Sequence, residues 1–323
     1  MGIGYFFIIL IWYLYDFKKE SLKCYAKVPR FFHLNQMRLL NPSLKWKTYL
    51  LAVGISFYCF LQILYKEISQ PLWRLDMLDI GQGLANLIVV NGKGVLYDTG
   101  ASWAGGSMAE LEIIPYLQRE GIELEQVILS HDDNDHVGGA ETILKHYPQA
   151  KLMTASAQNY GKTDRTFCEA GKTWTWQHLT FKALSPTKIV KRAKNTDSCV
   201  LLISDGSHHI LLTGDADIAA EKQFVNQLSQ LDVLQVGHHG SKTSTGYELL
   251  YQTRPKIALI SSGRWNPWQF PHVQVVQRLK RYQTAVYNTG ELGQISLLFH
   301  AKHIEIQTAR TDFSPWYRRL IGL

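Results

Sequence analysis

Two histidines and three aspartates stand within six consecutive residues, in the run His131-Asp132-Asp133-Asn134-Asp135-His136. The run follows the apolar segment 127–129 and precedes Gly138-Gly139, which is typical of a loop between a buried strand and a helix. A short loop at a strand end can point several ligands at one place, and imidazoles mixed with carboxylates suit Zn²⁺ or Mn²⁺. The simpler interpretation is a polar turn that caps the helix. So many candidate ligands in one short loop favour the metal site over the turn.

Two later strand ends carry further candidate ligands. Asp215 follows the apolar run 210–212, and the pair His238-His239 follows the apolar run 233–236. Each would be an ordinary strand-to-loop turn if it stood alone. Because loops that carry function cluster along one edge of such a sheet pair, we expect both to reach the same place as the loop 131–136.

The elements that must position these residues form two similar halves. Each half reads as alternating strands separated by glycine turns and followed by helix and strand units. In the first half we expect strands at 73–79, 85–90 and 95–97, a helix at 109–120, a strand at 126–129, a helix at 138–146 and a strand near 152. Mixed strands at 174–183 end this half. In the second we expect strands at 199–204 and 210–213, a helix at 218–228, a strand at 233–236, a helix at 247–252, a strand at 257–261, a helix at 273–282 and closing strands. This order predicts an α/β fold in which two mixed sheets pack face to face with helices outside.

Two apolar runs precede these elements. Residues 48–65 are uncharged and mostly apolar, with lysines just outside, which predicts a transmembrane helix rather than a buried core helix. Residues 2–15 form a second, shorter run, which predicts that the chain is the tail of a longer membrane protein. A signal peptide is the rival interpretation, but its charged first part and small-residue cleavage site are missing.

The charge pattern predicts how the chain is oriented in the membrane. Residues 16–47 carry 8 Lys and Arg against 2 Asp and Glu, so the positive-inside rule places them in the cytoplasm. Everything after residue 65 then lies in the periplasm or outside the cell. We expect a membrane segment at 1–70, a catalytic domain at 72–310 and a tail at 311–323.

The net charge of the whole chain is weak evidence for nucleic-acid binding by that domain. The formal charge is +7, which would suit an anionic partner. Residues 1–72 hold 9 Lys and Arg against 3 Asp and Glu, a net of +6, so residues 73–323 carry only +1. The apolar content of 46% excludes a disordered or fibrous chain.

The four cysteines form neither a zinc knuckle nor a disulfide framework, because none of them is in a CxxC pair. A bridge between Cys168 and Cys199 is conceivable in an oxidising compartment. Two unrelated buried thiols are the favoured interpretation.

An ordered series of short motifs accompanies the candidate ligands. In chain order they are Asp79-Ile80-Gly81-Gln82-Gly83, Asp98-Thr99-Gly100, His131 to Gly139, Asn195-Thr196-Asp197-Ser198, Leu212-Thr213-Gly214-Asp215, His238-His239-Gly240-Ser241, and Asn266 with His272. With this series the chain resembles the metallo-β-lactamase superfamily, from about Trp73 to Leu298. Within that superfamily it is similar to the C-terminal domain of ComEC-type DNA-internalisation (competence) proteins. The resemblance implies an αββα four-layer sandwich, here preceded by one or two transmembrane helices.

The resemblance also implies a pair of divalent metal ions, Mn²⁺ or Zn²⁺, with Mg²⁺ as a further candidate. One ion would be held by His131 and Asp133, and the second by Asp135, His136 and one histidine of the pair 238–239, with Asp215 bridging both. Of that pair we expect His238, the residue nearest the strand end. Two bridged cations lower the pKa of bound water and clamp the attacking and leaving oxygens of a displacement, which suits phosphodiester hydrolysis.

The chain departs from the broad superfamily pattern in four places. Asp133 stands at the usual second histidine of the loop, and Asn195 stands at a later histidine. Harder, oxygen-rich ligands at the first ion favour Mn²⁺ or Mg²⁺ there, and that ion is expected to be weakly held. Leu84 replaces a common acidic residue and Val273 replaces a common proline, both on the substrate side.

The resemblance implies a membrane-tethered phosphodiesterase or nuclease that acts on DNA during uptake, at the cytoplasmic (inner) membrane. Its catalytic residues would be Asp135, Asp215 and His272. Its partners would be DNA, in particular a single strand, the membrane and the remaining parts of an uptake channel. The residues expected to contact substrate are Asn195, Ser198, His239, Ser241, Asn266, Lys191 and Arg192.

Two further segments bear on the substrate. Residues 181–195 hold five Lys and Arg and no acidic residue, which indicates either a phosphate-gripping edge or a solvated loop. Trp265, Trp268 and Phe270 flank Asn266 and could stack bases of a single strand, or serve a core or an interface. Two other functions stay open. One is another hydrolase of the same fold, such as a lactonase or thioesterase, and the other is a non-catalytic DNA-binding module of the uptake channel.

Overall fold

The computed structural model describes residues 50, 52–61 and 70–310. The chain divides into two units, residues 1–68 and 69–323. In the first unit, residues 50 and 52–61 are helical, within the predicted span 48–65. Over the described ranges no helix has both the length and the apolar character needed to cross a membrane. The predicted run 2–15, the basic segment 16–47 and the tail 311–323 lie outside the described residues, so the membrane assignment stays a prediction.

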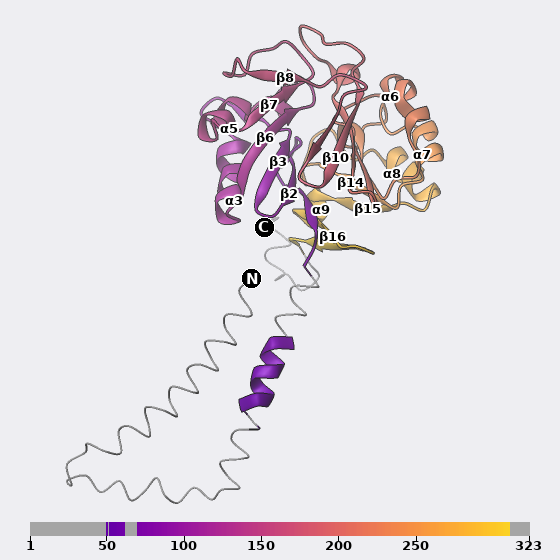
Figure 1. Cartoon of the computed structure of the whole chain (residues 1–323). Helices are drawn as coiled ribbons and strands as arrows, with labels where there is room; N and C mark the ends of the chain where they lie inside the picture. Colours follow the sequence, from indigo (N-terminus) through magenta and orange to yellow (C-terminus); the bar gives the residue numbers. More distant parts are fainter. Residues whose placement is uncertain (1–49, 51, 62–69, 311–323) are drawn as a thin grey trace, which may run out of the picture. The chain divides into compact units, whose positions relative to one another are not determined.

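The second unit contains two large mixed sheets (Figure 1). The strand order of the first is β17 (Ile304–Thr308), β16 (Ile295–Phe299), β1 (Trp73–Met77), β2 (Asn86–Val90), β3 (Lys93–Tyr97), β6 (Glu123–Leu129), β7 (Lys151–Thr154) and β8 (Arg165–Phe167). The order of the second is β15 (Ala285–Asn288), β14 (Ile257–Ile260), β13 (Val233–Gln235), β12 (His209–Leu212), β11 (Val200–Ser204), β10 (Leu179–Ser185) and β9 (Thr173–Trp176). A short hairpin, β4 (Ser102–Trp103) and β5 (Gly106–Ser107), follows β3.

Helices cover the outer faces of both sheets (Figure 1). Beside the first sheet lie a π-helical turn (Ala109–Ile113), α3 (Ile114–Arg119), α4 (Asn134–Val137) and α5 (Ala140–His146). Beside the second lie α6 (Ile218–Phe224), a 3₁₀ turn (Val225–Gln227), α7 (Tyr247–Thr253) and α8 (Val273–Arg281). A short helix, α9 (Thr289–Leu292), joins β15 to β16.

Side-chain alternation along the strands produces the layers. In β2, Ile88 faces a core between the two sheets, whereas Leu87 faces a separate core under α3 and α5. In the second sheet, Leu212 faces the inter-sheet core and Leu211 packs under α6, α7 and α8. Strands buried on both faces account for the near-continuous apolar runs of the sequence. The predicted four-layer αββα sandwich is confirmed.

The parallel strands bring the candidate site together. The strands β3, β6, β7 and β8 run parallel in one sheet, and β12, β13, β14 and β15 run parallel in the other. The carboxyl ends of parallel neighbours meet at one edge, so the segments that follow β6, β12, β13 and β14 converge there. They contain the loop 131–136, Asp215, the pair 238–239 and the loop 261–272, respectively.

The helix predicted at 138–146 begins later than expected, and a separate helical turn precedes it. That turn, α4, ends at Val137 and contains Asp135 and His136, so these two ligands do not lie in an open loop. The predicted helix itself, α5, begins at Ala140. A Cβ atom at Gly138 would collide with the backbone of Ser102, and one at Gly139 would collide with the backbone of Thr99. The two glycines therefore let the ligand loop pack directly on the segment that follows β3.

Cys168 and Cys199 form a disulfide, so the prediction of two unrelated thiols is wrong. Cys168 directly follows β8 of the first sheet, and Cys199 directly precedes β11 of the second. Both are buried in the inter-sheet core, with Cα atoms 5.7 Å apart, a separation that a disulfide spans without distortion. The 31-residue separation in sequence could not reveal this approach, because it depends on the packing of the two sheets.

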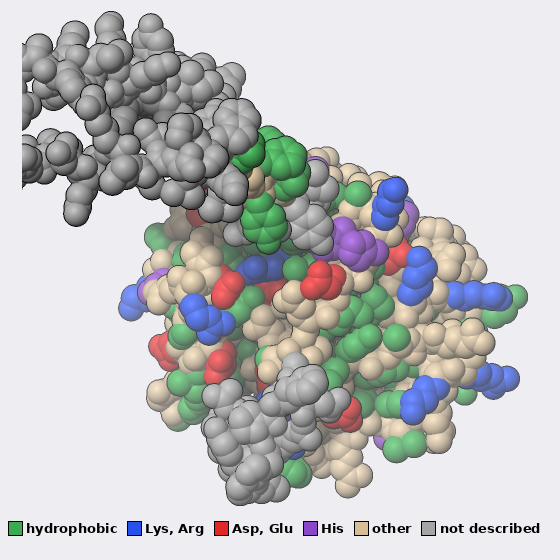
Figure 2. All heavy atoms as spheres, turned by 90° about the horizontal axis from the view of Figure 1, so that it is seen from below, with side chains coloured by type: hydrophobic (Ala, Val, Ile, Leu, Met, Phe, Trp, Pro, Cys, Tyr) green, Lys and Arg blue, Asp and Glu red, His purple; other side chains and the backbone are tan. Residues whose placement is uncertain are grey.

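The charges of the second unit are spread out. On the face shown in Figure 2, the described Lys and Arg side chains are scattered among acidic, apolar and neutral ones. This agrees with the small net charge of residues 73–323.

Candidate metal centre

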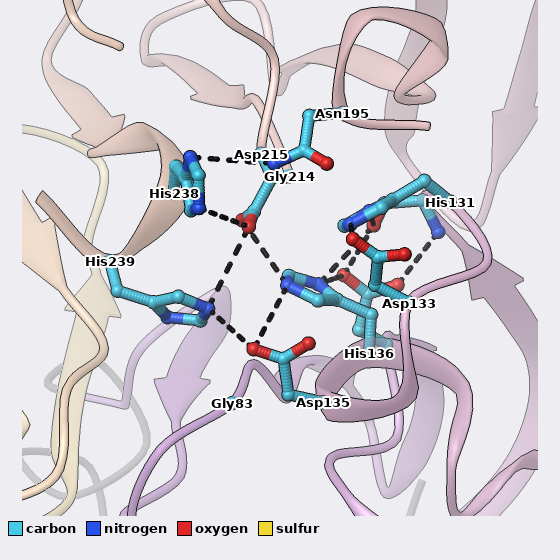
Figure 3. Close-up of polar contacts among 12 residues, drawn as sticks. Gly83, His131, Asp133, Asp135, His136, Asn195, Gly214, Asp215, His238 and His239 are labelled. Atoms are coloured by element: carbon cyan, nitrogen blue, oxygen red, sulfur yellow. Dashed lines mark hydrogen bonds and ion pairs between the residues drawn. The ribbon is translucent and has the colours of Figure 1, made fainter. Parts of the chain in front are cut away.

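The predicted ligands meet at the edge where β6, β12 and β13 end (Figure 3). The side chains form two overlapping groups, His131 with His136 and Asp215, and Asp135 with His136 and His239. Within each group the ligand atoms all lie within 4.8 Å of one another. His136 belongs to both groups, and its Nε2 is 3.2 Å from Oδ1 of Asp215. On the other side of His136, Nε2 of His239 is 3.1 Å from Oδ2 of Asp135.

Three buried atoms at this place have no partner with hydrogen-bond geometry in the described part of the chain, although two of them lie 3.2 Å from each other. They are Nε2 of His131, Nε2 of His136 and Oδ1 of Asp215. Buried polar atoms of this kind are uncommon and need an explanation, such as an ion. A divalent cation would satisfy all three, because imidazole nitrogens and carboxylate oxygens are its usual donors. The residues present therefore fit the metal pair that the resemblance implies.

Asp98 fixes the direction in which His136 points. One carboxylate oxygen of Asp98 accepts a hydrogen bond from Nδ1 of His136 at 2.8 Å and another from Oγ of Ser130 at 2.7 Å. Its other oxygen accepts the backbone N–H of Ser130 at 2.7 Å. The Nε2 atom of His136 is thereby turned toward the centre, as is usual for metal-binding histidines with a carboxylate behind them. Asp98 belongs to the Asp98-Thr99-Gly100 motif, to which we gave no role from the sequence.

The electrostatics of the centre come from buried pairs of opposite charge. Burial lowers the pKa of His136, but Asp215 and Asp98 outweigh burial and raise it well above its usual value. Burial raises the pKa of Asp215, but His136 and His239 hold it well below its usual value. Burial likewise opposes ionisation of Asp135, but its hydrogen bond with His239 and the charge of His136 lower its pKa to about 2. The carboxylates are therefore ionised, and a cation would bind in competition with protons on the histidines.

Asp133 stands at the outer side of the centre. Its Oδ2 is 3.6 Å from Nε2 of His131, and its side chain is 47% exposed. The interaction with His131 lowers the pKa of Asp133. Asp133 therefore lies beside His131, but among the described residues it belongs to neither ligand group.

The structure brings His239 into the group with Asp135 and His136, where we expected His238. Both histidines have left-handed backbone conformations, with φ of 51° and 55°, in the turn Gly237–Gly240. His239 is buried, and its Nδ1 donates to the carbonyl of Ser261 at 2.9 Å, which aims Nε2 at Asp135. His238 lies across the centre, with Nε2 3.8 Å from Oδ2 of Asp215. Sequence position alone could not resolve this choice, because it depends on the strained turn.

Several predicted substrate contacts instead support the ligands. Ser198 is fully buried, and its Oγ accepts the backbone N–H of Asp215 at 3.3 Å. Asn195 places its Nδ2 3.4 Å from Nδ1 of His238 (Figure 3). Ser241 is buried, and its hydroxyl bonds the hydroxyl of Thr243 at 3.0 Å.

The other predicted residues lie around the centre. Asn266 braces its own loop, donating from Nδ2 to the carbonyls of Gly263 at 2.6 Å and Phe270 at 2.8 Å. His272 caps α8, where its Nδ1 accepts the N–H of Gln274 at 3.3 Å. Among the described residues, His272, which we predicted to be catalytic, belongs to neither ligand group. Lys191 and Arg192 are exposed.

Asp132 and Asn134, the remaining members of the loop, hold neighbouring segments. One oxygen of Asp132 accepts the N–H of Ala193 at 2.6 Å, and the other accepts the hydroxyls of Ser156 and Tyr160. Asn134 donates to the carbonyl of Ser102 at 2.9 Å. Asp132 thus attaches the basic segment around Ala193 to the ligand loop.

Comparison with known proteins identifies the superfamily of the chain. A model of the Metallo-beta-lactamase superfamily matches residues 78–264. The chain is 56% identical to Recombination protein 2 of Haemophilus influenzae, over 98% of this chain and 40% of that protein. It is 34% identical to ComE operon protein 3 of Bacillus subtilis, over 73% of this chain and 34% of that protein. It is 30% identical to Competence protein ComA of Neisseria gonorrhoeae, over 85% of this chain and 38% of that protein. The chain thus spans 40% or less of each of these relatives.

Proposed function

The chain belongs to the metallo-beta-lactamase superfamily, and from this premise we propose that it is a two-metal phosphodiesterase that cleaves DNA during uptake. The observation that carries the proposal is the pair of ligand groups around His136 and Asp215, with unpartnered buried atoms facing the centre. One ion would be held by His131, Asp133 and Asp215. The other would be held by Asp135, His136, His239 and Asp215.

The cation pair, when bound, would supply an acidified water and a positive charge that stabilises the pentacovalent phosphate. The protein's part is to fix the geometry. Asp215 belongs to the first group, and its Oδ2 is also 3.8 Å from Nε2 of His239 in the second. Ser198 holds Asp215 at its backbone N–H. The half-buried His238 and Asn195 border Asp215 and can present N–H groups to a phosphate oxygen. In this proposal they contact substrate, whereas Asp98 and Ser198 only position ligands.

DNA as the substrate is supported by the relatives and by one surface segment. Relatives named for recombination and competence suggest a role in DNA uptake for this chain. The basic run Lys188, Lys191, Arg192 and Lys194 is exposed, and Asp132 holds its backbone beside the ligand loop. Such a run can bind phosphates on either side of the scissile bond.

We place the catalytic domain outside the cytoplasmic membrane, tethered by residues 48–65 beside the other parts of an uptake channel. The basic segment 16–47 supports this orientation through the positive-inside rule. The disulfide Cys168–Cys199 supports it independently, because such bonds persist in oxidising compartments. Protease accessibility of the domain in right-side-out vesicles tests the orientation, and full protection would exclude it.

The function is tested with the purified full chain in detergent, loaded with Mn²⁺ or Zn²⁺ and given labelled single- and double-stranded DNA. We expect metal-dependent cleavage that Asp215→Asn abolishes and that Asp164→Asn, a change at an exposed aspartate, leaves intact. Equal cleavage by the Asp215 variant would refute the mechanism. DNA binding without cleavage would favour a transport module, and turnover of a lactone or thioester alone would change the substrate class.

A further inference from the structure

Two tryptophans project from the loop between β14 and α8. Trp265 is 80% exposed and Trp268 is 61% exposed. The guanidinium of Arg264 lies 5.5 Å from the centre of the Trp265 ring. Rings so exposed contribute little to the core, and large exposed apolar groups often mark a binding site.

Both ends of this loop are attached to the turn that carries His238 and His239. At its start, the carbonyl of Ser261 accepts the Nδ1–H of His239 at 2.9 Å. Toward its end, the ring of Phe270 lies 6.0 Å from the His238 ring and 6.5 Å from the His239 ring, measured between centroids. The N–H of His272 then donates to the carbonyl of Gly240 at 2.9 Å. The loop is therefore a neighbour of the metal centre.

The loop is also held in one shape from inside. Asn266 donates to the carbonyls of Gly263 and Phe270 and accepts the N–H of Phe270 at 2.8 Å. Gly263 in turn donates to Oε1 of Gln82, in the turn after β1, at 3.3 Å. Trp265 and Trp268 thus project from a loop that internal hydrogen bonds already hold in one shape. A ligand that stacks on them would lose little binding free energy to the ordering of this loop.

We propose that Trp265 and Trp268 select unpaired DNA by stacking its bases beside the metal centre. This inference rests on the proposed phosphodiesterase function. Flat aromatic faces next to a cationic side chain suit a nucleobase and its phosphate, and every base offers such a face. In a duplex the faces are already stacked on neighbouring bases, so only a single strand can use both rings. On the opposite flank, the basic run 188–194 would hold the phosphates that lead away from the site.

Binding is measured with the full chain in EDTA, where no cleavage occurs, by the fluorescence anisotropy of a labelled oligothymidylate. For the double variant Trp265→Ala/Trp268→Ala we expect the Kd to rise about tenfold to a hundredfold, since stacking is lost at two positions. Trp265→Phe/Trp268→Phe should recover most of the affinity. Duplex DNA of the same length should bind both variants as it binds the unaltered chain.

The matched control is an Arg–aromatic pair elsewhere on the surface. Tyr251 is 64% exposed, with the guanidinium of Arg254 5.8 Å from its ring centre. The pair lies at the end of α7, where Thr253 bonds Leu231 just before β13 starts, so it is at the opposite edge of the sheet from the centre. Tyr251→Ala should leave the Kd unchanged.

Two further readouts separate this proposal from its rivals. An abasic oligonucleotide of the same length, which offers phosphates but no base to stack, should bind the double alanine variant and the unaltered chain equally weakly. An unaltered chain that hydrolyses no phosphodiester would defeat the proposed function, whereas the binding series would still report on the loop. Unchanged oligothymidylate affinity in the double alanine variant would overturn the stacking proposal. If that variant instead lost binding to vesicles of anionic lipid, the loop would be a membrane contact.

Discussion

The two sides of the metal centre differ in how firmly the protein holds their ligands. On the His239 side, His239 is 3% exposed and is hydrogen-bonded through both ring nitrogens, to Ser261 and to Asp135. On the His131 side, the Asp133 side chain is 47% exposed and lies 3.6 Å from His131. Asn195, at the place of a usual ligand histidine, contacts His238 instead. In the proposed two-ion centre, this difference predicts one tightly held and one labile ion.

Replacing His239 should remove the more tightly held ion. We expect His239→Ala to reduce the metal content from two ions per chain to one or none, because in the proposed centre its Nε2 would bind the ion and alanine offers no ligand atom. His238→Ala, the adjacent control, should retain two ions while weakening catalysis. Metal analysis after gel filtration in Mn²⁺ distinguishes the variants. Loss of an ion in the His238 variant with retention in the His239 variant would reverse the assignment made here.

A buried carboxyl behind the tight side should make stability depend on pH. Burial raises the pKa of Glu221 to about 7, although it accepts the backbone N–H groups of Thr245 and Gly246 in the segment after the histidine turn. The folded protein then binds a proton that the unfolded chain releases near pH 4.5. The contribution of Glu221 to the free energy of unfolding is therefore largest below pH 4.5. It falls by about 3 kcal/mol as the pH rises through 7.

Urea unfolding of the metal-free chain and of Glu221→Gln at several pH values measures this contribution. The variant should remove the fall between pH 4.5 and 7 that is specific to Glu221. A difference between the two proteins that is the same at every pH would show that this carboxyl keeps its usual pKa.

Asp98 should raise the affinity for the more tightly held ion without contacting that ion. Asp98→Asn removes the carboxylate that orients His136, and such changes weaken metal binding by about tenfold to a hundredfold. Isothermal titration with Zn²⁺ measures the affinity, with circular dichroism to verify folding. Ion affinity within twofold of the unaltered chain would mean that packing alone orients His136.

The labile side can be strengthened in a final, smaller test. Asp133→His restores an imidazole at the exposed position, and we expect Zn²⁺ to bind the weaker site about tenfold more tightly, since imidazole suits Zn²⁺ better than a lone carboxylate. Asp164→His, at another exposed aspartate, should have no effect. Titration that resolves the two sites reports the change, and equal affinities in all three proteins would argue against Asp133 as a ligand.

The sequence predicted most of the layers because strand alternation and helical periodicity are local signals. It also placed His131, Asp135, His136 and Asp215 at one sheet edge, since each follows a recognisable strand. The comparisons confirm the resemblance to the metallo-β-lactamase superfamily and to competence proteins.

What the sequence could not resolve depends on distances between segments far apart in the chain. Asp98 and Ser198 hold ligand residues through contacts with segments that are distant in sequence. The residues next to them in sequence do not predict these partners. The choice between His238 and His239 depends on two consecutive left-handed residues. The approach of Cys168 to Cys199 depends on how one sheet lies on the other.

The cross-link between the sheets gives the basic segment an unusual topology. Residues 169–198, which include Lys191, Arg192 and Asn195, form a covalently closed loop whose two ends meet at the disulfide. A protease that nicked this exposed run would leave both parts of the chain joined. The nicked protein would migrate as one band on a non-reducing gel and as two bands after reduction.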